Sequence, residues 1–164
     1  ILAMPSSGLH SNGFSLVRHL IKIKKIDIKR ETFLKRELIR PTKIYVNEIL
    51  SLINKDLITG CANITGGGLV DNLIRIIPNK LCAEINLNEI KPLKIFKWLK
   101  SFNINDKEML KTFNCGVGFC IIINPRDLGK VKKYFSKEFK PYVIGRIING
   151  NEKVKLNDKI RWIR

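Results

Sequence analysis

The apolar segment at residues 117–123 (VGFCIII) constrains the fold of this chain more than any other feature. It is rich in β-branched residues and too short to cross a bilayer, so it predicts a central strand. Residues 81–87 alternate apolar and polar side chains, which predicts a half-buried strand. Apolar residues at helical spacing lie between and around these strands, at 14–21, 45–53 and 95–102. This mixture predicts an α+β fold, a layered domain with a mixed β-sheet covered by helices.

Weaker signals predict the remaining elements. Further strands are expected at 1–4, 57–64 and 142–148, and shorter helices at 31–39, 69–76, 106–110 and 128–135. Gly150-Asn151 predicts a hairpin turn into a strand at 154–156. Ser11 and Asn12 are suitable N-caps for the first helix, and Asp106 for a later one. Because no repeat, low-complexity stretch or internal linker interrupts the pattern, residues 1–164 are predicted to form a single domain.

The charge balance of the chain is strongly basic. Lysine and arginine number 31 against 14 acidic residues, which gives a formal net charge of +17. Such a balance suits a nucleic-acid-binding module, and this is our alternative of another class. The lysines are scattered over almost every segment without interleaved aromatic residues, so a compositional bias toward Lys, Ile and Asn explains the charge better. A positive field would still help to gather phosphorylated metabolites.

Several common kinds of site are not expected from this sequence. The four cysteines form no C-x-x-C pair and have no histidine at metal-ligand spacing, so we expect no metal site and read them as buried thiols. With no secretion signal or membrane span either, we expect a cytoplasmic protein without a membrane partner. His10 and His19 are the only histidines, and no conventional catalytic constellation surrounds them, so the catalytic residues stay unassigned.

The first polar, glycine-containing segment is residues 5–13 (PSSGLHSNG), between a predicted strand and a predicted helix. Its candidate binding residues are Ser7, His10, Ser11 and Asn12. Their hydroxyl, imidazole and amide groups, with the free N–H groups at the helix start, could bind an anion. The local sequence alone fits a well-capped helix entrance at least as well.

The second segment is residues 64–68 (ITGGG). Its candidates are Thr65, Gly66, Gly67 and Gly68, because consecutive glycines let backbone approach a ligand and turn N–H groups toward an anion. It is neither a Walker A loop nor a G-x-G-x-x-G fingerprint. A tight turn between strand and helix is an equally good interpretation.

The third segment is residues 112–118 (TFNCGVG), just before the predicted central strand. Asn114 is the candidate, as an amide that faces a ligand at the strand end. The alternative is structural, since glycines on either side of Val117 allow a neighbouring element to pack closely. We do not assign Cys115 as a nucleophile, because no histidine lies near it in the sequence.

These segments, in this order and spacing, resemble the aminoimidazole ribonucleotide synthetase (phosphoribosylformylglycinamidine cyclo-ligase) family. The matching motifs are SSGLHSNGFSLVR at 6–18, PTKIY at 41–45, ITGGG with Asp71-Asn72, FKWL at 96–99, TFNCGVG at 112–118 and VIG at 143–145. The resemblance runs from residue 1 to about residue 154. One position departs from it: Asn63 stands where the family usually has histidine, and an amide cannot titrate near neutral pH.

The resemblance implies the C-terminal domain of a two-domain synthetase whose ATP-binding N-terminal domain is absent from this chain. The family cyclises formylglycinamidine ribonucleotide to aminoimidazole ribonucleotide, with ADP and phosphate as products, in purine biosynthesis. ATP phosphorylates the formyl oxygen, which is a very poor leaving group without the phosphate. ATP and Mg²⁺ are expected mainly on the N-terminal domain, which also makes the homodimer contact.

The resemblance further implies that the two loops at 5–13 and 64–68 hold phosphate groups of substrate or nucleotide, and that the isolated chain is inactive. The nearest alternative within the superfamily is the ATP-using formylglycinamidine ribonucleotide synthetase, whose domains belong to a much longer chain. A regulatory or interaction fragment made without the catalytic half is a third hypothesis.

Overall fold

Two β-sheets organise the chain, and the computed structural model describes residues 1–162, so residues 163–164 of the predicted domain lie outside the described residues. The first sheet, sheet A, has the order β2-β4-β1-β5 and is antiparallel throughout. Its strands are β1 (Leu2–Pro5), β2 (Gly60–Asn63), β4 (Val117–Ile122) and β5 (Tyr142–Val143).

The second sheet, sheet B, is mixed and has the order β6-β3-β7. Its strands are β3 (Leu81–Asn86), β6 (Gly145–Asn149) and β7 (Val154–Asn157). β3 pairs antiparallel with β6 and parallel with β7. The predicted α+β class with a mixed sheet is therefore confirmed, although the strands divide between two sheets.

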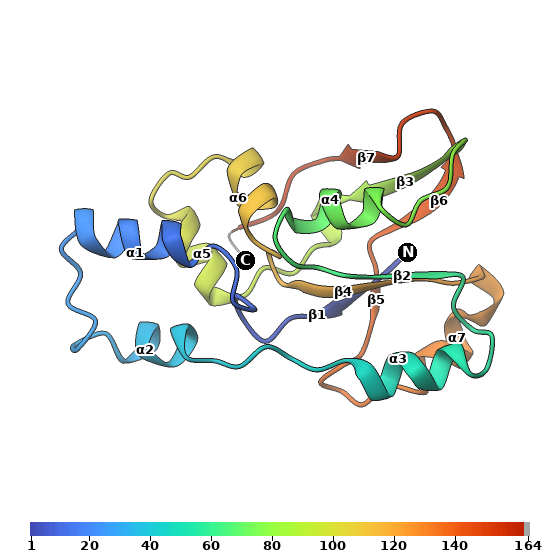
Figure 1. Cartoon of the computed structure of the whole chain (residues 1–164), viewed down its shortest axis with the longest axis horizontal. Coiled ribbons are helices and arrows are strands. Elements are labelled where there is room, and N and C mark those ends of the chain that lie inside the picture. The colour runs from blue at the N-terminus through green and yellow to red at the C-terminus, as the bar shows by residue number, and fades with distance from the viewer. Residues whose placement is uncertain (163–164) are drawn as a thin grey trace.

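Helices lie on both sides of sheet A and beyond one of its ends (Figure 1). They are α1 (Phe14–Ile23), α2 (Thr32–Leu38), α3 (Val46–Ile53), α4 (Gly68–Ile74), α5 (Lys94–Lys100), α6 (Asp106–Thr112) and α7 (Leu128–Lys132). Short 3-10 turns occupy Leu87–Glu89 and Pro125–Asp127. In Figure 1, α3 and α7 lie below sheet A, whereas α4 and α6 lie above it. No helix within residues 1–162 is both long and apolar enough to span a membrane.

The central position predicted for residues 117–123 is confirmed, because β4 pairs with both β1 and β2. Its alternate side chains enter two separate hydrophobic clusters. Ile121 belongs to a cluster with Leu52 of α3 and Val131 of α7. Cys120 belongs to the other, with Leu73 of α4. A strand that is buried on both faces shows a nearly continuous apolar sequence, which is why the pattern was informative.

The prediction of one strand at 142–148 is wrong, because the chain changes sheets at Ile144. The N–H of Ile144 donates to Ile1 O beside sheet A, at 3.0 Å, while its carbonyl accepts from Asn86 N of sheet B, at 2.8 Å. The next residue, Gly145, packs so closely on the backbone of Glu84 that a Cβ there would overlap the Glu84 carbonyl. One apolar run thus supplies both β5 and β6.

The predicted hairpin at Gly150-Asn151 is also wrong. β6 and β7 lie on opposite sides of β3 instead of pairing with each other. The connection crosses the start of β3, where Gly150 N donates to Lys80 O and Ala83 N donates to Lys153 O. A glycine-containing turn signals a reversal of the chain, but it does not decide which strand becomes the neighbour.

Two predicted helix caps are replaced by neighbouring residues. α1 has Gly13 at its N-cap, with φ +71° and no side-chain cap, in place of Ser11 or Asn12. α6 is capped by Asn105, whose side chain accepts from Glu108 N at 2.8 Å, in place of Asp106. Both helices also begin one residue after their cap, as the N-cap position requires. Several elements are shorter than predicted, most clearly β2, which begins at Gly60, and α7, which ends at Lys132.

Candidate functional site

The three predicted segments meet at one end of the strands of sheet A, where β1 and β2 end and β4 begins. Ser6 N donates to Gly116 O and Ile64 N donates to Gly118 O, each at 3.0 Å. The Asn114 amide donates to Gly8 O at 2.9 Å. We call residues 6–12, 64–68 and 114–118 the loop cluster. Segments that are about 50 residues apart in sequence therefore form one surface.

His10 is buried in the loop cluster as a neutral imidazole. Its Nε2 accepts the backbone N–H of Ser7 at 3.0 Å and that of Lys43 at 3.4 Å, so the ring proton lies on Nδ1. Burial, and secondarily the positive charge of Lys43, lowers the pKa of His10 to about 4. The residue also adopts φ +50°, a conformation that is uncommon for non-glycine residues.

Contacts from residues 40–43 hold this loop in place. Arg40 Nη1 donates to Ser7 O at 2.9 Å, and the Ser7 hydroxyl donates to Pro41 O at 2.8 Å. Arg40 is itself paired with the buried carboxylate of Glu37 at 2.8 Å. The side chains of Ser7 and His10 are therefore engaged in shaping the loop.

Gly118 allows two aromatic rings to pack against β4. A Cβ at this position would overlap the Tyr45 hydroxyl and would lie 2.8 Å from His10 Cε1. The Tyr45 hydroxyl donates to Pro5 O at 2.8 Å, which ties the start of α3 to the end of β1. The structural interpretation of this glycine is thus confirmed. The sequence predicted Tyr45 as an apolar residue of the helix at 45–53 and as part of the PTKIY motif, and it gave no signal for the hydrogen bond of the phenol hydroxyl.

Asn72 fixes the shape of the triple-glycine loop. Its buried amide donates to Gly68 O at 2.7 Å, to Gly66 O at 3.3 Å and to Thr65 O at 3.4 Å. The Thr65 hydroxyl donates to Asn72 Oδ1 at 3.2 Å. Sequence reasoning did not select Asn72, although the Asp-Asn pair that follows ITGGG was the available signal.

The nine predicted site residues divide into two groups. Ser11, Thr65 and Gly66 are exposed and Asn12 and Gly67 are half-buried, so these five form the accessible surface; Ser7, His10, Gly68 and Asn114 support it from below. The Asn12 side-chain oxygen lies 3.9 Å from the point that a Cβ on Gly66 would occupy, so the two loops adjoin.

Two buried polar atoms in the first loop have no hydrogen-bond partner among the described residues, namely Ser6 Oγ and His10 Nδ1. Their residues are only 4% and 7% exposed. A buried polar group without a partner costs about 1–3 kcal/mol, and such groups are rare in folded proteins.

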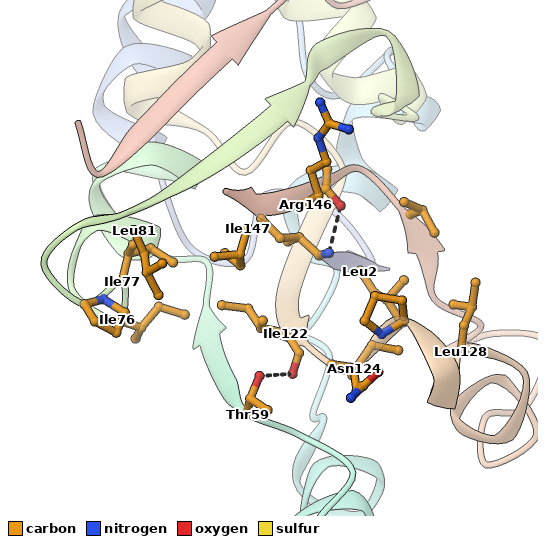
Figure 2. Close-up of a pocket in the computed structure, with 16 residues that line it drawn as sticks. Leu2, Thr59, Ile76, Ile77, Leu81, Ile122, Asn124, Leu128, Arg146 and Ile147 are labelled. Atoms are coloured by element: carbon orange, nitrogen blue, oxygen red, sulfur yellow. Dashed lines mark hydrogen bonds between the residues drawn. The ribbon is translucent and has the colours of Figure 1, made fainter. Parts of the chain in front are cut away.

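Two cavities lie near the two ends of sheet A. A cavity of about 290 Å³ beside the loop cluster is lined by Tyr45, Phe119 and the exposed Asn63, the position where the resembled family usually has histidine. A larger cavity of about 600 Å³ lies at the opposite edge, where Leu2, Ile77 and Ile122 line it with mostly apolar atoms (Figure 2). The polar groups of the motifs are thus separated from this 600 Å³ cavity by the length of the strands of sheet A.

The four cysteines are free thiols, and three of them are buried. Burial raises the pKa of Cys120 to about 12 and raises that of Cys115 strongly as well. Such thiols are protonated and unreactive at neutral pH. Within residues 1–162, no three His, Cys, Asp or Glu side chains gather in a way that could hold a metal ion.

Comparison with known proteins gives a family and several close relatives. The family model of the AIR synthase related protein, C-terminal domain, matches residues 1–157. Phosphoribosylformylglycinamidine cyclo-ligase of Ligilactobacillus salivarius is 40% identical over 163 residues, which cover 93% of this chain and 47% of that protein. The enzyme of the same name from Methylobacillus flagellatus is 40% identical over 154 residues, covering 90% and 44%.

A plant relative extends the same comparison. The chloroplastic/mitochondrial phosphoribosylformylglycinamidine cyclo-ligase of Vigna unguiculata is 39% identical over 157 residues, covering 92% of this chain and 40% of that protein. The chain thus spans about half the length of the curated relatives it matches. Among solved structures, T. maritima PurL complexed with FGAR has a TM-score of 0.49 at 15% identity, covering 68% of this chain and 18% of that one.

Proposed function

The chain belongs to the family of AIR synthase related protein C-terminal domains, and from this premise we propose that it forms the C-terminal half of the active-site cleft of a phosphoribosylformylglycinamidine cyclo-ligase. The complete enzyme would cyclise formylglycinamidine ribonucleotide to aminoimidazole ribonucleotide at the expense of ATP. The observation that carries this proposal is the loop cluster, where the three segments of the motif set meet at one sheet edge.

In this proposal the exposed residues of the loop cluster hold phosphate oxygens. The Ser11 hydroxyl can donate to an anion, and the backbone at Gly66 is open to close approach because it carries no Cβ. The supporting residues fix these groups in advance, so that little ordering remains when the ligand binds. Positioning and charge neutralisation are the main requirements of phosphoryl transfer.

The residues of this chain do not fit a magnesium site by themselves. Mg²⁺ prefers carboxylate oxygens, but the loops at 5–13 and 64–68 contain none, and the carboxylate beside Gly67 is that of Asp71 in α4. The N-terminal half of the complete enzyme would therefore supply the ligands to any Mg²⁺ and most contacts to ATP. We include that half, a homodimer and a cytoplasmic location in the proposal; the free thiols agree with a reducing compartment.

The experiment mixes the chain with its own N-terminal half and measures ATP-dependent formation of aminoimidazole ribonucleotide. We expect no turnover by the chain alone and turnover by the two halves together. The control adds formylglycinamide ribonucleotide with glutamine in place of the cyclo-ligase substrate, which tests for the related synthetase. If the two halves joined in one polypeptide fold, bind ATP and still fail to close the ring, the proposal is wrong.

A further inference from the structure

A third cavity, of about 420 Å³, opens next to β5, at the same end of sheet A as the loop cluster. Three lysines line it, and each comes from a different part of the chain. Lys91 precedes α5, Lys132 ends α7 and Lys140 precedes β5. We call this cavity the lysine cavity. None of the sequence motifs includes these three residues, and the proposed function makes no use of them.

The three ammonium groups lack acidic partners. The ion pairs formed within residues 1–162 involve other basic residues, and none of them includes Lys91, Lys132 or Lys140. No aspartate or glutamate lines the cavity either. Three lysines without acidic partners around one hollow attract anions, and an anion bound there would also offset the repulsion between like charges.

The surrounding backbone holds one wall of the cavity in position. Lys91 Nζ lies 4.6 Å from the centre of the Tyr142 ring, a cation–π contact that places this ammonium group at the cavity. Gly116 adopts φ +103°, and a Cβ there would lie 2.5 Å from Lys91 O, so the glycine lets the two segments approach. Gly116 O also accepts from Ser6 N, which connects this wall to the loop cluster.

We propose that the lysine cavity is a second anion site, which binds the phosphate group of a small phosphorylated metabolite. Lysine ammonium groups are compact charges with donors in several directions, which suits a phosphate dianion better than a planar carboxylate. The cavity volume leaves room for a small organic body against Pro141 and Tyr142. This inference does not depend on the proposed function, because it uses neither the glycine loops nor ATP.

The basic composition of the chain is the reason for a matched control. With a net charge of +17, any lysine cluster attracts anions weakly. Lys22, Lys24 and Lys25 at the end of α1 are exposed, and they line none of the cavities described above. Replacing them with glutamine removes the same three charges as replacing the cavity lysines.

The test titrates the full chain with inorganic phosphate at constant ionic strength and follows backbone amide shifts by NMR. We expect saturable shifts at Lys91, Gly116 and Tyr142. The triple variant K91Q/K132Q/K140Q should bind phosphate about tenfold more weakly, whereas K22Q/K24Q/K25Q should stay within about twofold of the parent chain. Glycerol 3-phosphate should give the same pattern, and glycerol none.

Equal weakening in both triple variants would show that only the overall charge matters and would overturn the proposal. Shifts that do not saturate, or that map to other residues, would overturn it as well. If the cavity variant does not fold, as judged by circular dichroism, the single variant K140Q at an exposed side chain replaces it, with K24Q as its partner control. The ring-closure assay does not enter this test, so the two proposals can fail independently.

Discussion

The loop cluster and the neighbouring Asn72 of α4 comprise two kinds of residue that differ in what their side chains touch. His10, Asn72, Asn114 and Gly118 are buried, and each contacts backbone or rings of a second segment. Ser11 and Gly66 are exposed, and Gly66 has almost empty space around it. The buried residues therefore stabilise the fold of the surface, whereas the exposed residues are available to contact a ligand. Substitutions in the first group should cost stability, and those in the second should cost ligand affinity alone.

The largest expected effect is that of Gly118→Ala, which forces a methyl group onto Tyr45 and His10 in a buried site. We expect a loss of about 3–4 kcal/mol in the free energy of unfolding, measured by urea denaturation. The matched control is Gly129→Ala in α7, where a Cβ meets nothing within 4 Å. The control should be neutral or up to about 1 kcal/mol more stable, because alanine favours helix.

The next effect is a dependence of stability on pH that comes from His10. Its pKa is lowered to about 4 in the folded chain, against about 6.5 when unfolded, so the unfolded state binds the proton first as the pH falls. Stability is therefore complete above pH 6.5 and should fall by up to about 3 kcal/mol toward pH 4. Urea denaturation across this range should show a shallower slope in His10→Gln. Equal slopes would refute the buried neutral imidazole.

A smaller loss is expected for Asn114→Ala. The substitution leaves Gly8 O and Gly116 N without the partners that they have at 2.9 Å and 2.8 Å. Two buried backbone groups without partners should cost about 2 kcal/mol. Thermal unfolding of this variant should be compared with that of Asn47→Ala, an exposed asparagine on α3. A similar melting temperature for both variants would remove Asn114 from the supporting group.

The smallest effect on stability is expected for Gly66→Ala. Its nearest neighbour is Asn12 Oδ1 at 3.9 Å, and the backbone does not require glycine, so the change should stay within about 0.5 kcal/mol. Two residues along, Gly68→Ala should be far more damaging, because its Cβ would overlap the Leu110 carbonyl. Chemical denaturation of the two variants compares them directly, and similar losses would contradict the division.

The sequence predicted the elements of the fold better than their partners. The continuous apolar run at β4 and the alternation at β3 led to the correct strands, because burial on two faces or one face leaves a direct pattern. These patterns report burial but not which strands pair with each other. The change of sheet at Ile144 and the placement of β7 beside β3 were therefore not predicted.

The candidate site was predicted only in part, because the residues that hold its loops in place come from segments far away in the sequence. Chemistry along the chain selected Ser11 and Thr65, but it could not show that Tyr45 packs on Gly118 or that Lys43 contacts His10. Such contacts join residues more than 30 positions apart. The family resemblance supplied the order of the motifs, and the meeting of those motifs at one edge is a property of the fold.

The most direct test of the central claim is the double variant Ser11→Ala/Gly66→Ala in the two-domain protein that carries this chain. The account predicts that kcat/KM for ATP-dependent ring closure falls about tenfold or more while the free energy of unfolding changes by less than about 1 kcal/mol. An unchanged kcat/KM would show that the exposed residues of the loop cluster do not bind the ligand and would contradict the account.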